Sequence, residues 1–215
     1  MLFKQNNKQK QEESKNTIIY DSKIEKIAVI DTETTWTDEV MSIGVVIAST
    51  NNFAVVDKKY YIITPQYIRG GMYSSALNIK SNKGVIAKRK NSINEIIQLL
   101  NFHNVKKIFA YNASFDFRHL PELKKFYWYD IMKVAANKNL NTKIPRHLEF
   151  CKNGRLKSGY GVEQMYRMLS GNCKYSESHN AIRDAEDELK ILAMLKLDLS
   201  IFETYSIINS PSKKS

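Results

Sequence analysis

Two acidic residues at the end of a short apolar run constrain this chain more than any other feature. Residues 27–30 are apolar and three of them are β-branched, which is typical of a strand buried on both faces. Asp31 and Glu33 follow, and side chains two residues apart on an extended chain point to the same side. Such carboxylates repel each other unless a cation lies between them. The stretch predicts a metal-binding strand end, with a solvent-facing strand end as the alternative.

The composition favours one domain with a polyanionic partner. The 215 residues suit a single domain with tails, and 43% are hydrophobic, enough for a substantial core. Lys and Arg number 33 against 22 Asp and Glu, and the net charge of +11 attracts phosphate. A compositional bias towards Lys, Asn, Ile and Tyr is the alternative explanation. With two cysteines, no apolar run of membrane-spanning length and no signal peptide, the expectation is a cytoplasmic protein with no membrane contact.

Apolar spacing predicts an α/β domain between two polar ends. Residues 1–23 are expected to form a flexible arm, 24–205 the domain and 206–215 a flexible tail. Strands are expected over 26–30, 40–49, 53–64, 107–111 and 127–132 (the last could instead begin a helix), and helices over 92–103, shortly after 112, and over 161–169 and 180–197. The first three strands should form an antiparallel meander, and Ser92 with Glu95 a capping box. Residues 66–91 are hard to assign. This order indicates a central mixed five-stranded sheet flanked by helices.

Two further acidic residues lie where the same sheet edge can gather them. Asp116 comes about one helical turn after the strand expected at 107–111, at the edge where α/β proteins place ligands. The alternative is an exposed acid favoured by the helix dipole. Asp184 lies at the border of the apolar stripe of the last helix, where a carboxylate can face a cleft between helix and sheet. His179 is expected in the loop before that helix, where a lone His is usually a solvated surface residue.

Together these residues resemble the DEDDh group of 3′–5′ exonucleases, a part of the ribonuclease-H-like superfamily. The group includes the proofreading subunit of bacterial DNA polymerase III, ribonuclease T and oligoribonuclease. The matching motifs, spread over roughly residues 25–200, are Asp31-x-Glu33 followed by Thr34, Asn112-x-x-Phe115-Asp116, and His179-x-x-x-x-Asp184 with Ala181 and Ala185 inside or beside it. The resemblance implies a ribonuclease-H-like exonuclease fold.

The resemblance also implies an activity: a metal-dependent 3′–5′ exonuclease that releases nucleoside 5′-monophosphates from single-stranded or frayed DNA or RNA. The implied cofactors are two divalent cations, Mg²⁺ or Mn²⁺, which prefer hard oxygen ligands. In the two-metal scheme of the family, Asp31 bridges both ions. Glu33 and Asp184 hold the ion that carries the attacking water, and Asp116 supports the other. His179 is the general base.

Several residues near these motifs are candidates for contacts with the substrate. Backbone groups of Glu33 and Thr34 could meet the terminal 3′-hydroxyl, and Phe115 could either wall the pocket or pack in the core. Aromatic side chains can stack on terminal bases, which suits Trp36 and Tyr111 better than Phe117, for which core packing is the expectation. The substrate-binding candidates are Thr34, Trp36, Asn112 and Phe115.

Some alternatives stay open at this point. The basic stretches 80–90 and 133–157 could follow the phosphate backbone or form solvated charged faces, and the choice between DNA and RNA has no visible determinant. Ribonuclease T and oligoribonuclease are dimers and proofreading subunits work in larger assemblies, so either a homodimer or a polymerase partner is implied. The rival functions are a catalytically weak nucleic-acid-binding or polymerase-associated module and an endonuclease or phosphodiesterase. A zinc site at His147, Cys151 and Cys173 is rejected, because no paired cysteine motif is present.

Overall fold

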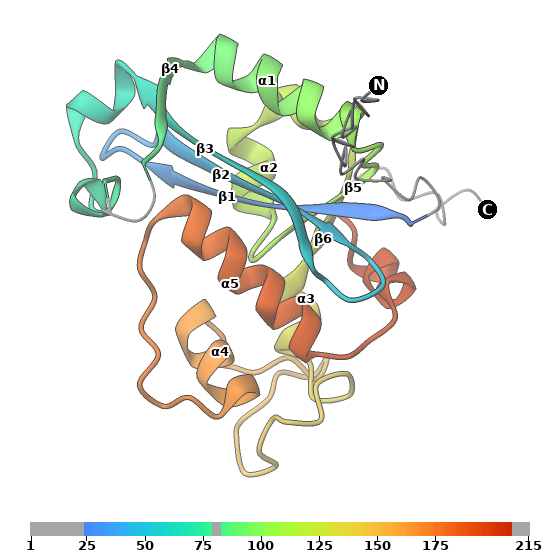
Figure 1. Ribbon diagram of the computed structural model, residues 1–215. Helices are drawn as coiled ribbons and strands as arrows, with labels where there is room; N and C mark the ends of the chain where they lie inside the picture. The colour runs from blue at the N-terminus through green and yellow to red at the C-terminus, as the bar shows by residue number, and fades with distance from the viewer. Residues whose placement is uncertain (1–23, 79–82, 208–215) are drawn as a thin grey trace, which may run out of the picture.

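The computed structural model describes residues 24–78 and 83–207, and it places six strands in one mixed sheet (Figure 1). In spatial order the strands are β4 (Val85–Lys88), β3 (Val55–Thr64), β2 (Val40–Ser49), β1 (Lys26–Thr34), β5 (Lys107–Ala110) and β6 (Tyr127–Asp130). β1, β2 and β3 form the expected antiparallel meander, whereas β5 runs parallel to β1, β6 to β5 and β4 to β3. The predicted mixed sheet is confirmed, with six strands in place of five.

Helices cover both faces of this sheet (Figure 1). One face is covered by α1 (Arg89–Phe102) and α2 (Ser114–His119), and the other by α3 (Ile131–Ala135), α4 (Val162–Ser170) and α5 (Ala181–Met194). Within the described residues, four 3₁₀ helices connect these elements: η1 (Gln66–Arg69), η2 (Ser74–Ala76), η3 (Pro121–Leu123) and η4 (Leu199–Tyr205). The result is a three-layer α/β domain with a separate hydrophobic core on each side of the sheet.

Strand β1 joins the two cores. Its apolar residues alternate between them: Ile27 and Val29 pack on the side of α5, and Ala28 and Ile30 on the side of α1. All four are fully buried, because β2 and β5 flank the strand and helices cover both faces. The alternation continues beyond the apolar run, so the odd-numbered acids of β1 face the side of α5.

The structure assigns one stretch that the sequence left open and corrects one local prediction. Strand β4 lies within the stretch that the sequence left unassigned. The capping box is wrong, because α1 begins at Arg89 directly after β4 and Ser92 is already inside the first turn. The Ser92 hydroxyl donates to the carbonyl oxygen of Lys88 at 3.3 Å, and Glu95 accepts a hydrogen bond from the Tyr61 hydroxyl at 2.9 Å. At residues 127–132 both expected alternatives occur in succession, since β6 ends at Asp130 and α3 begins at the next residue.

The ends of the chain fall partly outside the described residues. The arm expected at 1–23 and residues 208–215 of the expected tail lie there. Contacts with the sheet continue to Ile207, whose N–H donates to the carbonyl oxygen of Trp128 at 2.9 Å, two residues beyond the expected boundary at 205. Within the described ranges, every helix is too short or too polar to cross a bilayer.

Candidate active site

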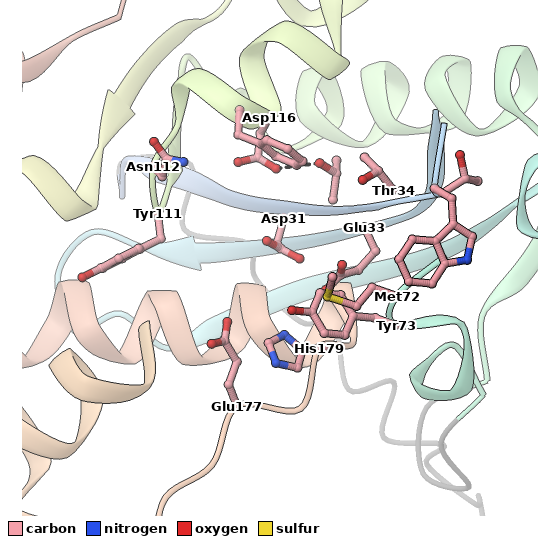
Figure 2. A pocket seen from close by; sticks show the side chains of 14 residues that line it. Asp31, Glu33, Thr34, Met72, Tyr73, Tyr111, Asn112, Asp116, Glu177 and His179 are labelled. Carbon is pink, nitrogen blue, oxygen red and sulfur yellow. Dashed lines mark hydrogen bonds between the residues drawn. The ribbon is translucent and has the colours of Figure 1, made fainter. Parts of the chain in front are cut away.

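A cleft of about 420 Å³ opens where β1 and β5 end, beside the start of α5 (Figure 2). Parallel neighbours such as β1 and β5 end at the same sheet edge, which is where α/β folds bind ligands. The lining residues come from β1 and the loop after it, the segment before η2, the β5–α2 connection and the loop before α5: Asp31, Thr32, Glu33, Thr34, Thr35, Trp36, Met72, Tyr73, Tyr111, Asn112, Phe115, Asp116, Glu177 and His179.

Asp31 and Glu33 point into the cleft from the same face of β1, as the spacing predicts (Figure 2). Burial raises the pKa of Asp31 well above its usual range, and the carboxylates of Glu188 and Asp116 add to the shift. Burial likewise raises the pKa of Glu33 to about 9, with a further contribution from Asp184. The buried Oδ2 atom of Asp31 has no hydrogen-bond partner in the described chain. The strand end therefore concentrates carboxyl groups whose ionised forms the protein itself does not stabilise.

Asp116 reaches this charge from the opposite side of β1. It lies in the first turn of α2, directly after β5, and only 2% of it is exposed, so the alternative of an exposed helix acid is wrong. The hydroxyl of Thr32, which lies between the two acids of β1, donates to Asp116 Oδ1 at 2.8 Å. Burial raises the pKa of Asp116 to about 7, although this hydrogen bond opposes the shift.

Asp184 is brought to the site by a close approach between α5 and β2. Gly44 pairs with Asp31 across the β1–β2 ladder, and a Cβ atom at Gly44 would lie less than 3.0 Å from the backbone of Ala181. The missing side chain lets the first turn of α5 rest on the sheet opposite Asp31. Asp184 lies in that turn, is 2% exposed, and accepts a hydrogen bond from the Ser178 hydroxyl at 3.2 Å. Burial, followed by the nearby carboxylate of Glu177, raises its pKa to about 7.

His179 lies in the loop before α5, as expected, but it is not a solvated surface residue. Its ring stacks on that of Tyr73, with centroids 3.8 Å apart and planes at 13° (Figure 2). The buried amide of Asn180 fixes the two segments together by donating to the carbonyl oxygen of Ala76 at 2.7 Å. One ligand atom from each of Glu33, His179 and Asp184 lies within 4.8 Å of the other two.

Sequence reasoning missed three residues of this site. Glu188 is 1% exposed, and its Oε2 atom accepts a hydrogen bond from the backbone N–H of Tyr111 at 3.0 Å. It follows Asp184 by four residues and so shares its helix face, which was a signal that the sequence offered. Glu177 and Tyr73 line the cleft from loops, where no periodicity marks them.

The candidates for substrate contacts all line the cleft. Trp36 is 68% exposed at the rim, Asn112 is exposed with a φ of 58°, and Thr34 and Phe115 are half-buried. Phe117 packs edge-on against the buried Trp128 at 5.8 Å, which agrees with the expectation of core packing. The structure thus brings together every predicted site residue, with Asp184 buried beside the cleft.

Comparisons with known proteins agree with this fold. The sequence matches no protein-family model, and no curated protein matches it. Among solved structures it is similar to a 3′-exonuclease that recognises a histone mRNA stem-loop (TM-score 0.57, 17% identity, 82% of this chain and 65% of that one). It is also similar to the nuclease domain of 3′hExo, a DEDDh family member bound to rAMP, with a TM-score of 0.56 and 14% identity. That match covers 80% of this chain and 92% of the other. A third match is E. coli exonuclease I with a dT13 oligonucleotide, with a TM-score of 0.54 and 14% identity. It covers 80% of this chain and 40% of the other. The chain therefore has the ribonuclease-H-like fold of the DEDDh 3′-exonucleases, and it spans only 65% and 40% of the first and third of these proteins.

Proposed function

We propose that this protein is a metal-dependent 3′–5′ exonuclease that removes nucleoside 5′-monophosphates from single-stranded or frayed DNA or RNA. The observation that carries the proposal is the gathering of Asp31, Glu33 and Asp116 in one cleft, with Asp184 buried beside them, in a fold of DEDDh exonucleases. These carboxylates come from a central strand and two helices that are far apart in the sequence. Such a concentration of buried charge weakens the fold, so it is expected where it serves a function.

The four carboxylates fit a site for divalent cations. Their oxygens are the hard ligands that Mg²⁺ and Mn²⁺ prefer, and the unpartnered Oδ2 atom of Asp31 is a buried acceptor that a cation would satisfy. Asp31, which feels the charge of all three other acids, is the residue best placed to be shared between two ions. Two bound ions would lower the pKa of an attacking water and stabilise the attacking and leaving oxygens at phosphorus.

His179 is the proposed general base. A neutral imidazole at this position accepts a proton from water at the mouth of the carboxylate cluster. A carboxylate oxygen of Asp184 lies within 4.8 Å of a ring nitrogen of His179, and an ionised carboxylate at that distance attracts the positive charge that the ring then gains. Stacking on Tyr73 holds the ring in the cleft and restricts its rotation.

The rim of the cleft is suited to a strand end. The exposed indole of Trp36 offers a stacking surface for a terminal base, and base–aromatic stacking tolerates any sequence. The half-buried ring of Phe115 and the side chain of Asn112 enclose the other side. The net charge of +11 favours binding of a polyanion. Because the similar proteins include one that binds RNA and one that binds single-stranded DNA, both sugars belong in the test.

The test is a time course on 5′-labelled single strands of DNA and RNA with one sequence, each with Mg²⁺, with Mn²⁺ and with chelator. We expect a ladder that shortens from the 3′ end only when metal is present, and a loss of at least about 100-fold in rate for Asp31→Asn and Glu33→Gln. Glu25→Gln is the matched control, because Glu25 precedes the same strand and its half-exposed side chain forms an ion pair with Lys107.

Three outcomes would contradict the proposal. If the wild-type protein cleaves a 3′-blocked oligonucleotide as fast as the unblocked one, the protein is an endonuclease or phosphodiesterase. Intact substrate in every lane, with binding retained, would leave a nucleic-acid-binding module on an exonuclease fold. Equal activity of wild-type protein and Asp31→Asn would place the chemistry elsewhere.

A further inference from the structure

Residues 133–157 form a second concentration of charge to which the cleft assigns no role. Seven basic side chains and one acidic side chain give this segment a net charge of +6, more than half of the net charge of the whole chain. In Figure 1 most of it forms the yellow loops below α3 and α4. Basic side chains of this kind either face solvent independently of one another or are arranged by the fold into a binding site.

The segment has a fixed backbone, although it contains few regular elements beyond α3. The N–H of Leu156 donates to the carbonyl oxygen of Ala136 at 2.9 Å, and the N–H of Lys138 to that of Gly154 at 3.0 Å. Leu156 and Ile144 are buried in the core beneath α5. The cations are therefore carried by a structure that holds their relative positions.

Two hollows open in this segment. One, of about 350 Å³, is lined by Lys133, Asn137, Asn153, Arg155 and Tyr205. The other, of about 420 Å³, has Lys138 and Arg146 in its lining. Among the described residues, no Asp or Glu lines either hollow. Both hollows therefore present cations, amides and hydroxyls without a competing anion, which is the chemistry of an anion site.

The charge in and around these hollows is incompletely satisfied from within the protein. The buried Nε–H of Arg155 has no hydrogen-bond partner in the part of the chain that the structure describes, and a buried unpaired donor costs free energy. The single acid of the segment, Glu149, is already paired with Lys157 at 3.0 Å. Lys133 lies 3.8 Å from Asp130, at the outer limit of an ion pair. Elsewhere in the segment, Arg146 forms no ion pair with any described residue.

The segment is also connected to the cleft. The guanidinium of Arg155 lies 5.4 Å from the ring centre of Tyr160, and the carbonyl oxygen of Tyr160 accepts a hydrogen bond from the Tyr111 hydroxyl at 2.6 Å. Tyr111 lines the cleft. A ligand held by the segment would thus have a set position relative to the carboxylates.

We propose that residues 133–157 bind backbone phosphates of a nucleic-acid strand, with one phosphate in the hollow beside Lys133 and Arg155. Arg presents a planar set of donors that matches the oxygens of a phosphate group. The contact holds the body of a long substrate outside the cleft, while its 3′ end meets the carboxylates. The identity of this ligand rests on the proposed function, but its test requires binding alone and no hydrolysis.

The test measures the fluorescence anisotropy of a 5′-labelled 30-nucleotide strand and of a trinucleotide, both in chelator over a series of salt concentrations. For Lys133→Gln/Arg155→Gln we expect about tenfold weaker binding of the long strand and a log–log salt slope reduced by about 0.7, because the variant loses one phosphate contact and each such contact to a single strand contributes about 0.7. The trinucleotide should bind as it does to wild-type protein. Arg146→Gln/Lys152→Gln changes only exposed side chains of the same segment and should weaken long-strand binding without lowering the melting temperature.

The charge-matched control is Lys59→Gln/Lys106→Gln, two exposed lysines outside the segment. An equal loss of affinity in this control, or an unchanged salt slope in both segment variants, would overturn the proposal. The proposal would also be overturned by a site that binds only free anions. In that case inorganic phosphate would raise the melting temperature of the wild-type protein but not of Lys133→Gln/Arg155→Gln, and both proteins would bind the long strand equally well. If the wild-type protein shows no hydrolysis and the long strand still binds as expected, the exonuclease proposal fails and this proposal stands.

Discussion

Replacing Gly44 by Ala should displace one carboxylate of the site from the other three. The new Cβ atom would lie less than 3.0 Å from the backbone of Ala181 and Ile182, whereas ordinary contacts begin near 3.4 Å. β2 cannot yield, because β1 and β3 hold it on both sides. The first turn of α5 must therefore move outward by about 1 Å, since packed backbones have no free space to absorb the overlap. Asp184 moves with that turn.

The size of the effect follows from two magnitudes. Overpacking of this kind costs about 1–3 kcal/mol, which for a domain of this size lowers the melting temperature by about 2–12 °C. A misplacement of about 1 Å at a reacting centre costs about 100-fold in rate. Binding of an oligonucleotide should change little, because Asp184 is 2% exposed and does not line the cleft surface that a nucleotide would meet.

The assay combines thermal unfolding with single-turnover hydrolysis over a range of Mg²⁺ concentrations. Gly161→Ala is the matched control, because its Cβ atom would meet only the end of the flexible Gln164 side chain, at 2.7 Å. We expect Gly44→Ala to need more Mg²⁺ for its half-maximal rate, as a displaced ligand requires, and Gly161→Ala to behave as wild type. A wild-type rate and Mg²⁺ dependence in Gly44→Ala would refute the role assigned to the contact between α5 and β2.

Three further predictions concern the same cleft. The raised pKa values of Glu33 (about 9) and Asp184 (about 7) mean that the metal-free folded protein binds more protons than the unfolded chain between about pH 4 and pH 9. Its stability should therefore fall as the pH rises through this window, and Glu33→Gln should unfold at a higher temperature than wild type at pH 8 but not at pH 4; equal shifts at both pH values would contradict this. Tyr73→Ala should lower kcat about tenfold, whereas Tyr73→Phe, which keeps the stack on His179, should retain most of it; equal losses would show that the hydroxyl matters and the stack does not. Trp36→Ala should raise KM about tenfold without a change in melting temperature, because base stacking contributes about 1–3 kcal/mol and the exposed indole supports no core; an unchanged KM would remove Trp36 from the substrate site.

The parts of the molecule that could be predicted are those where burial leaves a pattern in the sequence. Residues 27–30 form a continuous apolar run because β1 is covered on both faces, and the acids beyond it keep the alternation of the strand. Strand β4 left no such pattern, since Val85 and Ile86 are each more than half exposed at the sheet edge. A four-residue edge strand has neither a run nor a period to detect.

The errors in the site and at the start of α1 have a similar origin. Glu188 was not proposed as a site residue, because its burial depends on the backbone of Tyr111, which approaches from another element. Tyr73 reaches His179 through a loop whose path is set by tertiary contacts such as that of Asn180 with Ala76. The capping box at Ser92 fitted the local pattern, but β4 leads directly into α1 and starts the helix earlier.

The position of β1 at the middle of the sheet also determines how the site can come apart. Asp31 and Glu33 lie on a strand whose neighbours are paired on both sides, so its amides exchange with solvent only when the sheet opens as a cooperative unit. His179 and Tyr73 lie on connecting segments, which can open in smaller local fluctuations. Asp31 and Glu33 are thus the last residues of the site to be lost, and the proposed base can leave and return while these two carboxylates stay in place.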